Sequence, residues 1–107
     1  HQFVKIGEHS MIAGGSLIRK DVPPFCKAGK EPLSYRGVNS IGLKRRNFSS
    51  DQINQVQNIY RILYLEGRNN TQAIEKIEKD TPNSKERKSV LNFIKGSERG
   101  IIKGLLD

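Results

Sequence analysis

The sequence predicts the end of a β-solenoid followed by a small bundle of helices, on three observations. Isoleucine recurs every six residues near the N-terminus, at Ile6, Ile12 and Ile18. Two adjacent prolines, Pro23 and Pro24, then interrupt that repeat. Further along the chain, apolar residues recur at helical spacing between capping residues and glycines, which is typical of short amphipathic helices.

The six-residue repeat fits neither a helix nor a single strand, whose periods are about 3.6 and 2 residues. The units are residues 6–11, 12–17 and 18–23, each with Ser or Val at its fifth position. Such repeats are typical of β-solenoids, and we expect three units to complete one turn. Each Ile is expected to point inward, and Gly7 and Ala13 to fit tight corners. Chance spacing is the alternative, and the column of small residues argues against it.

The repeat is expected to end at residues 21–24, because proline lacks an N–H donor and is excluded from central strands. Beyond it, residues 25–28 and 33–38 are expected to be short extended segments. A turn at residues 29–32, which contain Gly and Pro, joins them.

A basic segment at residues 41–46 precedes the first long helix. Ser49 and Gln52 have the spacing of a capping box, which predicts the helix start, and Gly67 is the expected stop. The residues on its apolar face are Ile53, Val56, Tyr60, Leu63 and Tyr64.

A second helix is expected over residues 70–79, and a third between a cap at Ser84 and a stop at Gly96. Their core-facing residues are Ala73, Ile74, Ile77, Val90, Leu91, Phe93 and Ile94. The apolar tail that follows has no predicted form. The chain therefore divides into residues 1–38, with the last coils and the connecting strands, and residues 39–107, a helical domain.

The chain carries a formal net charge of +8 and a single cysteine, Cys26. This charge favours an anionic partner, such as nucleic acid, an anionic membrane surface, a nucleotide sugar or an acidic protein. A lone cysteine forms no internal disulfide, so we expect a reducing, cytoplasmic setting. No apolar run in the sequence is long enough to span a membrane, and no signal peptide opens it.

Three segments carry a family resemblance: "HQFVKIGEHSMIAGGS", "KDVPPF" and "GVNSIGLKRRNFS". In this order and spacing they closely resemble the acyl-carrier-protein–UDP-N-acetylglucosamine O-acyltransferase family, which performs the first step of lipid A biosynthesis. The resemblance implies the end of a left-handed parallel β-helix built from hexapeptide repeats, followed by a small all-α C-terminal domain. It also implies a homotrimer with active sites between neighbouring subunits.

The activity that the resemblance implies moves a 3-hydroxyacyl chain to the 3-hydroxyl of UDP-N-acetylglucosamine. The donor is the phosphopantetheine thioester of acyl carrier protein, and neither a metal nor a further cofactor is expected. The family's general base is a histidine on an earlier coil, before this chain starts. His1 and His9 do not inherit that role. We therefore expect no catalytic residue in this chain, which would be inactive alone.

The substrate-binding candidates begin with Arg45 and Arg46, preceded by Lys44. The planar guanidinium suits phosphate oxygens and a uracil carbonyl, although most basic helix ends are only solvated. The resemblance implies that both arginines meet the uridine-diphosphate group and that Asn39 helps hold it. Asn is also a good helix cap. Some relatives place an acidic residue at Ile41, which cannot accept a hydrogen bond through its side chain.

Three further candidates come from the resemblance alone. His1 and Gln2 would line the sugar and pantetheine side of the cleft, or would be a corner pair without a ligand. Gly14 would border the acyl groove, so that its replacement by Met shortens the accepted chain. The alternative is a corner glycine needed only for the turn.

Other functions stay open at this level. A basic nucleic-acid-binding module would use residues 44–46 on phosphates, although no helix-turn-helix, zinc-ligand or stacking-aromatic pattern appears. A trimerisation fragment without binding activity is a second alternative. A third is another hexapeptide acyltransferase, one acting on UDP-3-O-acyl-glucosamine.

Overall fold

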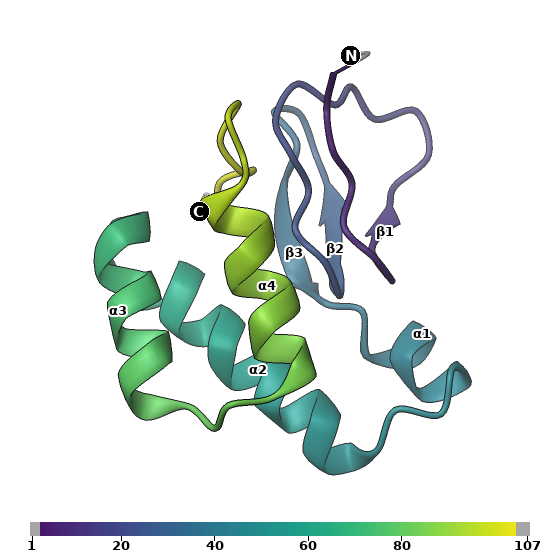
Figure 1. The fold of residues 1–107 in the computed structure, drawn as a ribbon. Helices are drawn as coiled ribbons and strands as arrows, with labels where there is room; N and C mark the ends of the chain where they lie inside the picture. Colours follow the sequence, from purple (N-terminus) through teal and green to yellow (C-terminus); the bar gives the residue numbers. More distant parts are fainter. Residues whose placement is uncertain (1–2, 105–107) are drawn as a thin grey trace.

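The computed structural model describes residues 3–104 of the chain. The strands lie together on one side, α2, α3 and α4 pack on the other, and α1 lies below β1 (Figure 1). The elements are β1 (Met11–Ile12), β2 (Cys26–Gly29), β3 (Ser34–Val38), α1 (Ser40–Arg45), α2 (Ser50–Tyr64), α3 (Asn70–Asp80) and α4 (Lys85–Lys95). No helix among the described residues is long and apolar enough to cross a membrane.

The N-terminal segment makes one coil whose return is parallel. Met11 in β1 lies opposite Lys27 in β2, and Ile6 forms a parallel bridge with Val22. In both pairs the partner lies 16 residues further along the chain. Three six-residue units predict a separation of 18 residues. The Val22 N–H donates to the Lys5 carbonyl at 2.9 Å. An 18-residue return would place Pro24 opposite Ile6, and proline has no N–H to donate.

Two of the three isoleucines of the repeat pack against the core, as predicted. Ile12 and Ile18 are partly buried against the core, but Ile6 is 51% exposed. Of the described strands and bridges, only the one at Val22 pairs with Ile6. Ile6 therefore lies at an open edge of the described coil rather than in its interior.

The connecting strands follow the prediction more closely. β2 and β3 pair in antiparallel order, with a register irregularity between Lys27 and Ala28. β2 alternates between buried and exposed residues at its start, where Cys26 and Ala28 are buried and Lys27 is exposed. This alternation places Lys27 on the side of the sheet that faces away from the core.

The helices begin at the predicted caps. The Ser49 hydroxyl accepts from the Gln52 N–H and the Gln52 side chain accepts from the Ser49 N–H, which makes the predicted capping box of α2. Asn69 and Gln72 form a second, unexpected capping box at the start of α3. Ser84 caps α4 and Gly96 follows its end, as expected. α2 ends three residues before Gly67.

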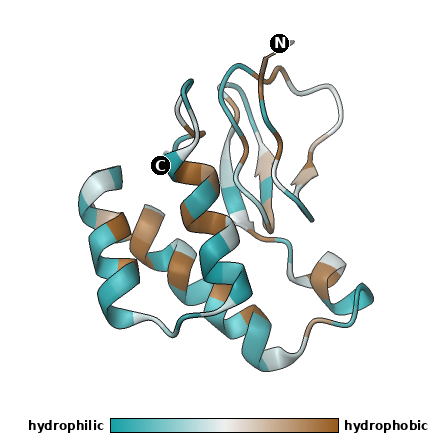
Figure 2. Ribbon diagram, viewed as in Figure 1, coloured by the Kyte–Doolittle hydropathy of each residue, from teal (hydrophilic) through white to brown (hydrophobic). Residues whose placement is uncertain are grey.

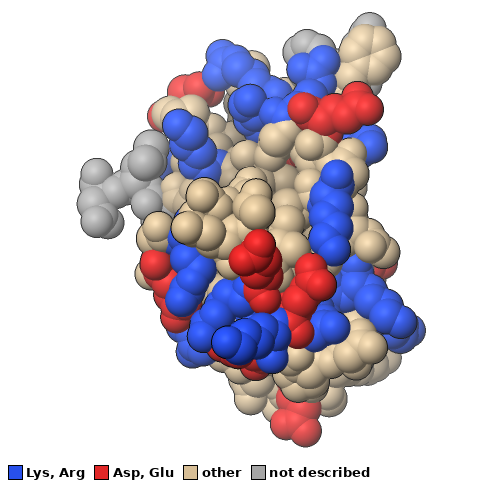
Figure 3. Space-filling model, turned by 60° about the vertical axis from the view of Figure 1, so that its left-hand side comes forward, with Lys and Arg blue, Asp and Glu red and all other residues tan. Residues whose placement is uncertain are grey.

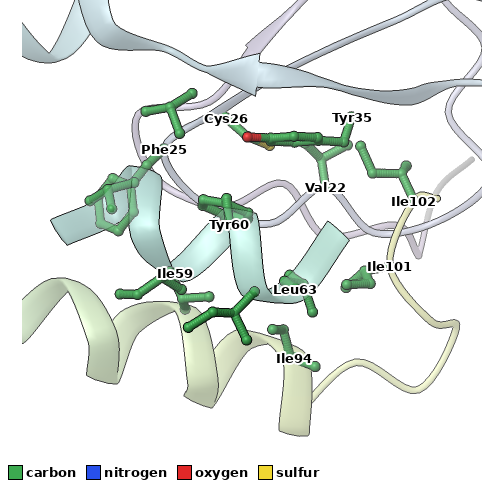
Figure 4. Packing of buried hydrophobic residues seen from close by; sticks show 14 of the residues in the cluster. Val22, Phe25, Cys26, Tyr35, Ile59, Tyr60, Leu63, Ile94, Ile101 and Ile102 are labelled. Atoms are coloured by element: carbon green, nitrogen blue, oxygen red, sulfur yellow. The ribbon is translucent and has the colours of Figure 1, made fainter. Parts of the chain in front are cut away.

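Apolar segments of the three longer helices face the interior (Figure 2). Tyr60 of α2 is fully buried and its hydroxyl donates to the Pro24 carbonyl. The rings of Tyr35, Tyr60 and Tyr64 are nearly parallel and form a triangle. The centroid distances are 4.5 Å from Tyr35 to Tyr64, 5.3 Å from Tyr35 to Tyr60, and 6.0 Å from Tyr60 to Tyr64. Figure 4 shows side chains of the coil, the strands, α2, α4 and the C-terminal tail meeting in this cluster. Ile74 and Phe93, expected in the core, are partly buried at its edge.

The tail, for which the sequence predicts no form, pairs with the coil. The Ile102 N–H donates to the Asp21 carbonyl and the Asp21 N–H donates to the Gly100 carbonyl, both at 2.9 Å. The Asp21 carboxylate, 1% exposed, accepts from the Lys5 N–H and the Ser97 hydroxyl. Asp21 therefore ties the N-terminal coil to the end of the helical part.

Candidate functional site

A groove of about 820 Å³ lies between the strands and α1. Three of the residues that line it are cations, and none is a carboxylate. The lining residues are Ser10, Met11, Lys27, Val38, Asn39, Ser40, Ile41, Gly42, Arg45 and Arg46. The groove thus brings together three predicted binding residues, Asn39, Arg45 and Arg46, and its charge suits an anionic ligand.

The Asn39 side chain connects α1 to the coil beside this groove through two hydrogen bonds. Its side-chain oxygen accepts from the Gly42 N–H at 3.3 Å, which caps α1. Its side-chain nitrogen donates to the His9 carbonyl at 3.0 Å. With only 7% of its surface exposed, Asn39 joins α1 to the corner of the coil. A Cβ at position 42 would lie 2.5 Å from the Asn39 nitrogen, so this close approach requires glycine.

The two arginines at the end of α1 differ in their surroundings. Arg45 and Arg46 are both exposed. An NH group of the Arg46 guanidinium lies 2.8 Å from Nδ1 of His9, and arginine only donates, so Nδ1 accepts. Arg46 also lines a second cavity, of about 320 Å³, together with His9. Lys44 is exposed, but it is not among the residues that line the groove.

Two residues that lie near the arginines are not among the predicted site residues. Lys27 lines the groove from β2; strand alternation indicates that it faces outward but not what it faces. His9 contacts Arg46, which lies 37 residues further along the chain. No local pattern relates them, because the return of the coil and the turn into α1 bring them together.

Ile41 is one of three apolar side chains that line the groove, together with Met11 and Val38. Its side chain is 68% exposed and lines the groove beside Gly42 and Arg45. It contributes apolar surface where an acidic residue would accept hydrogen bonds.

The remaining candidates lie elsewhere. Gly14 is exposed and does not line this groove. A Cβ at Gly14 would meet nothing within 4 Å, and the left-handed backbone of this corner belongs to Gly15, with φ +77°. The turn itself therefore does not require glycine at position 14. His1 and Gln2 lie outside the described residues.

The only cysteine is an unreactive part of the core. Cys26 is fully buried, and its Sγ lies 3.2 Å from the Pro23 carbonyl oxygen. Burial raises the pKa of this thiol to about 12, so that the nucleophilic thiolate is scarce at neutral pH. Among residues 3–104, no three His, Cys, Asp or Glu side chains are grouped so that they could hold a metal ion.

A family model described as UDP-N-acetylglucosamine O-acyltransferase, domain 2, matches residues 21–102. The chain belongs to the UDP-N-acetylglucosamine O-acyltransferase family. This confirms the resemblance drawn from the sequence motifs. The match includes Asp21, the groove residues from Lys27 to Arg46, and the tail that pairs with the coil.

Solved structures of this family have the same fold. The UDP-N-acetylglucosamine acyltransferase of Bacteroides fragilis superposes with a TM-score of 0.94 at 47% identity. The Acinetobacter baumannii protein has a TM-score of 0.89 at 36% identity. Each alignment covers 96% of this chain and 40% of the solved chain.

A curated relative agrees with this. The acyl-[acyl-carrier-protein]–UDP-N-acetylglucosamine O-acyltransferase of Thiobacillus denitrificans is 39% identical over 103 residues, which is 96% of this chain. The chain spans about 40% of the length of that relative.

Proposed function

We propose that this chain is the C-terminal part of an acyltransferase that moves a 3-hydroxyacyl group from acyl carrier protein to the 3-hydroxyl of UDP-N-acetylglucosamine. The names of the relatives that match nearly all of the chain, acyl-[acyl-carrier-protein]–UDP-N-acetylglucosamine O-acyltransferase, support the donor, the acceptor and the O-acyl transfer. In lipid A biosynthesis this is the first step. Its general base would lie on an earlier coil, so the 107-residue chain would bind substrate without catalysing the reaction.

The observation that supports a binding role is the meeting of Lys27, Arg45 and Arg46 in one groove. A nucleoside diphosphate sugar carries two negative charges on its diphosphate, and guanidinium groups bind phosphate oxygens through two parallel hydrogen bonds. The exposed Ile41 side chain offers apolar contact but no hydrogen bond. Hydrogen bonds to the uridine would therefore come from other groups of the groove, such as Ser10 and Ser40.

The proposal extends to the assembly. The coil of residues 3–24 would be the last of a left-handed parallel β-helix, and the division into residues 1–38 and 39–107 would hold in the whole protein. Phe3, Ile6, Met11 and Leu17 each expose more than half of their surface. Earlier coils and two further subunits of a homotrimer would cover such apolar surface.

The remaining family expectations belong to the same proposal. The enzyme would be cytoplasmic and would need no metal or cofactor besides the carrier's phosphopantetheine. His1 and Gln2 would face the sugar and the pantetheine. Gly14, which has open space around it, would admit a long acyl chain, so Gly14→Met in the full-length enzyme shifts the preference to shorter chains. An unchanged chain-length profile contradicts this.

The test is calorimetric binding of UDP-N-acetylglucosamine to the full-length enzyme and to the 107-residue chain. Because hydrogen bonds to charged groups contribute about 1.5–3 kcal/mol, Arg45→Ala weakens binding by about ten- to a hundredfold. The matched control is Arg36→Ala, which removes an exposed arginine of β3 outside the groove and leaves the affinity unchanged. An equal loss in both variants would mean that net charge, rather than the groove, binds the ligand.

The same titration with single-stranded and duplex DNA tests the nucleic-acid alternative. On the face shown in Figure 3, acidic side chains lie among the lysines and arginines. Such mixing does not favour a phosphate-backbone track on that face. Salt-dependent DNA binding without UDP-sugar binding would replace the proposed function.

A further inference from the structure

We propose that His9 is a positioning residue that fixes the Arg46 guanidinium at the nucleotide groove by accepting its hydrogen bond at Nδ1. The inference rests on the proposed function, because it assigns His9 to the groove that would bind the UDP-sugar. His9 itself does not line that groove. It would act only through Arg46, which lines both the groove and the cavity that contains His9.

The backbone of His9 is held on several sides. His9 has a φ of +57°, in the left-handed region that non-glycine residues seldom adopt. Its carbonyl accepts from the Asn39 side chain at 3.0 Å. On one side of it the Glu8 carbonyl accepts from the Phe25 N–H, and on the other the Ser10 hydroxyl donates to the Pro23 carbonyl. These bonds set the direction in which the imidazole leaves the chain.

The imidazole ring is restricted by two aromatic rings. It stacks on Phe25 with a centroid distance of 5.9 Å and an interplanar angle of 17°. Phe48 meets it edge to face, with a centroid distance of 5.3 Å. Contacts on the face and at the edge limit rotation of the ring. The Nδ1 atom stays 2.8 Å from the guanidinium, although both side chains lie near the surface.

The hydrogen bond requires one protonation state. Since arginine can only donate, Nδ1 carries a lone pair and the ring proton lies on Nε2. An imidazolium would have no acceptor and would place two cations in contact. The other charged groups around the same cavity are Glu8, Lys85 and Glu86, and the Glu8 carboxylate already accepts from the Ser89 hydroxyl at 2.8 Å.

The contact between His9 and Arg46 explains why Arg45 and Arg46 need not contribute equally to ligand binding. A free arginine side chain loses considerable rotamer entropy when it binds a ligand. The bond to His9 restrains Arg46 before the ligand arrives, which lowers this cost. Arg45 lines the groove without lining the His9 cavity. Loss of His9 should therefore weaken binding through Arg46 alone.

Two variants of the full-length enzyme separate the acceptor from the fold. His9→Gly tolerates the positive φ and removes the acceptor. His9→Asn also tolerates the left-handed backbone and offers a side-chain oxygen that accepts but does not titrate. We expect UDP-N-acetylglucosamine to bind His9→Gly about three- to tenfold more weakly at pH 8. His9→Asn should stay within about twofold of the wild type, and His9→Gly in an Arg46→Ala background should cause no further loss.

The pH profile gives a readout that a purely structural role would not change. Histidine gains its charge between about pH 8 and 5, whereas the diphosphate of a UDP-sugar, doubly esterified, keeps its charge over this interval. Affinity of the wild type should fall on acidification, and affinity of His9→Asn should not. Equal profiles for the two proteins, or His9→Gly with wild-type affinity, would overturn the inference.

A nitrogen-15 spectrum of the imidazole, recorded at pH 8 without ligand, separates the two proposals. A proton on Nε2 and an unprotonated Nδ1 whose signal shifts in Arg46→Ala support the contact. A proton on Nδ1 contradicts it. If this signature is present but no UDP-sugar binds at any pH, the proposed function fails while the contact between His9 and Arg46 stands.

Discussion

Gly7 shows at the level of a single residue why the six-residue repeat needs small side chains. It occupies the second position of its unit, where the sequence predicts a tight corner. A Cβ at Gly7 would lie 2.3 Å from the nitrogen of Pro24 and 2.6 Å from its Cα. These are backbone and ring atoms of a buried residue, so the neighbour cannot move aside. The conflict is steric, and Gly7 needs no special backbone angle.

Gly7→Ala should therefore destabilise the protein by about 1–3 kcal/mol, the range for inserting atoms into a packed interior. The measurement is the urea midpoint at constant slope. Gly14→Ala is the matched control, because its Cβ meets nothing within 4 Å. We expect that variant to be neutral or slightly more stable. Similar losses in both variants would show that contact with Pro24 is not the cause.

At the level of elements, two contacts position α1: the buried Leu43 side chain packs in the core, and the Asn39 side chain makes two hydrogen bonds. α1 has six residues, too few for an isolated helix to be stable in water. Asn39 caps it with its oxygen and ties it to His9 with its nitrogen. The binding and capping interpretations of Asn39 are therefore compatible, since the cap places Arg45 and Arg46 beside the coil.

Two substitutions separate these two bonds. Asn39→Asp keeps a capping oxygen and loses the donor to the His9 carbonyl, whereas Asn39→Ala loses both. Loss of a cap costs about 0.5–2 kcal/mol, so Asn39→Ala should be the less stable in urea. Both should bind UDP-N-acetylglucosamine more weakly than the wild type. Wild-type binding by Asn39→Asp would show that the bond to His9 does not position α1.

At the level of the whole molecule, one core joins the coil to the helices. Cys26, Tyr35, Tyr60 and Tyr64 belong to this region. Burial is the main cause that raises the pKa of each of these groups, and the charge of the Cys26 thiolate is a further cause for the tyrosines. The cluster therefore resists ionisation while the chain is folded.

The raised pKa of Cys26 makes the folded chain less stable at alkaline pH. In the unfolded chain the Cys26 thiol loses its proton near its ordinary pKa of 9.0, and in the folded chain only near about 12. The contribution of this thiol to the free energy of unfolding is fully present below pH 9, and it is lost as the pH rises from about 9 to about 12. The urea midpoint should fall over this interval, and less steeply in Cys26→Ala. Parallel curves for the two proteins would assign the alkaline loss to other groups.

The assembly is a further prediction for the whole molecule. The exposed Ile6 and Met11 of the coil suggest that the chain associates. Light scattering on a sizing column should give a mass near three times 12.1 kDa for the 107-residue chain. A monomer would mean that the trimer needs the earlier coils of the proposed β-helix.

Much of the local structure could be predicted from the sequence, because caps and periodicity act between neighbours. Ser49 and Gln52 form the expected box. The parallel pairing of the coil does not end at the prolines, because β2, which follows them, pairs in parallel with β1. The motifs also identified the family. The predicted return of 18 residues is wrong because Pro24 cannot donate within a ladder.

Only the tertiary structure decided what these elements meet. The fold places His9 against Arg46 and Ile102 beside Asp21. It also places Lys27 in the groove with Arg45 and Arg46. In each case the residues that meet are far from one another in the sequence. Capping, turn and periodicity rules describe interactions within a few residues, so the sequence determined which elements form and which family they belong to. Contacts between distant elements depend on how a shared core packs, and that packing decided the surroundings of the candidate site.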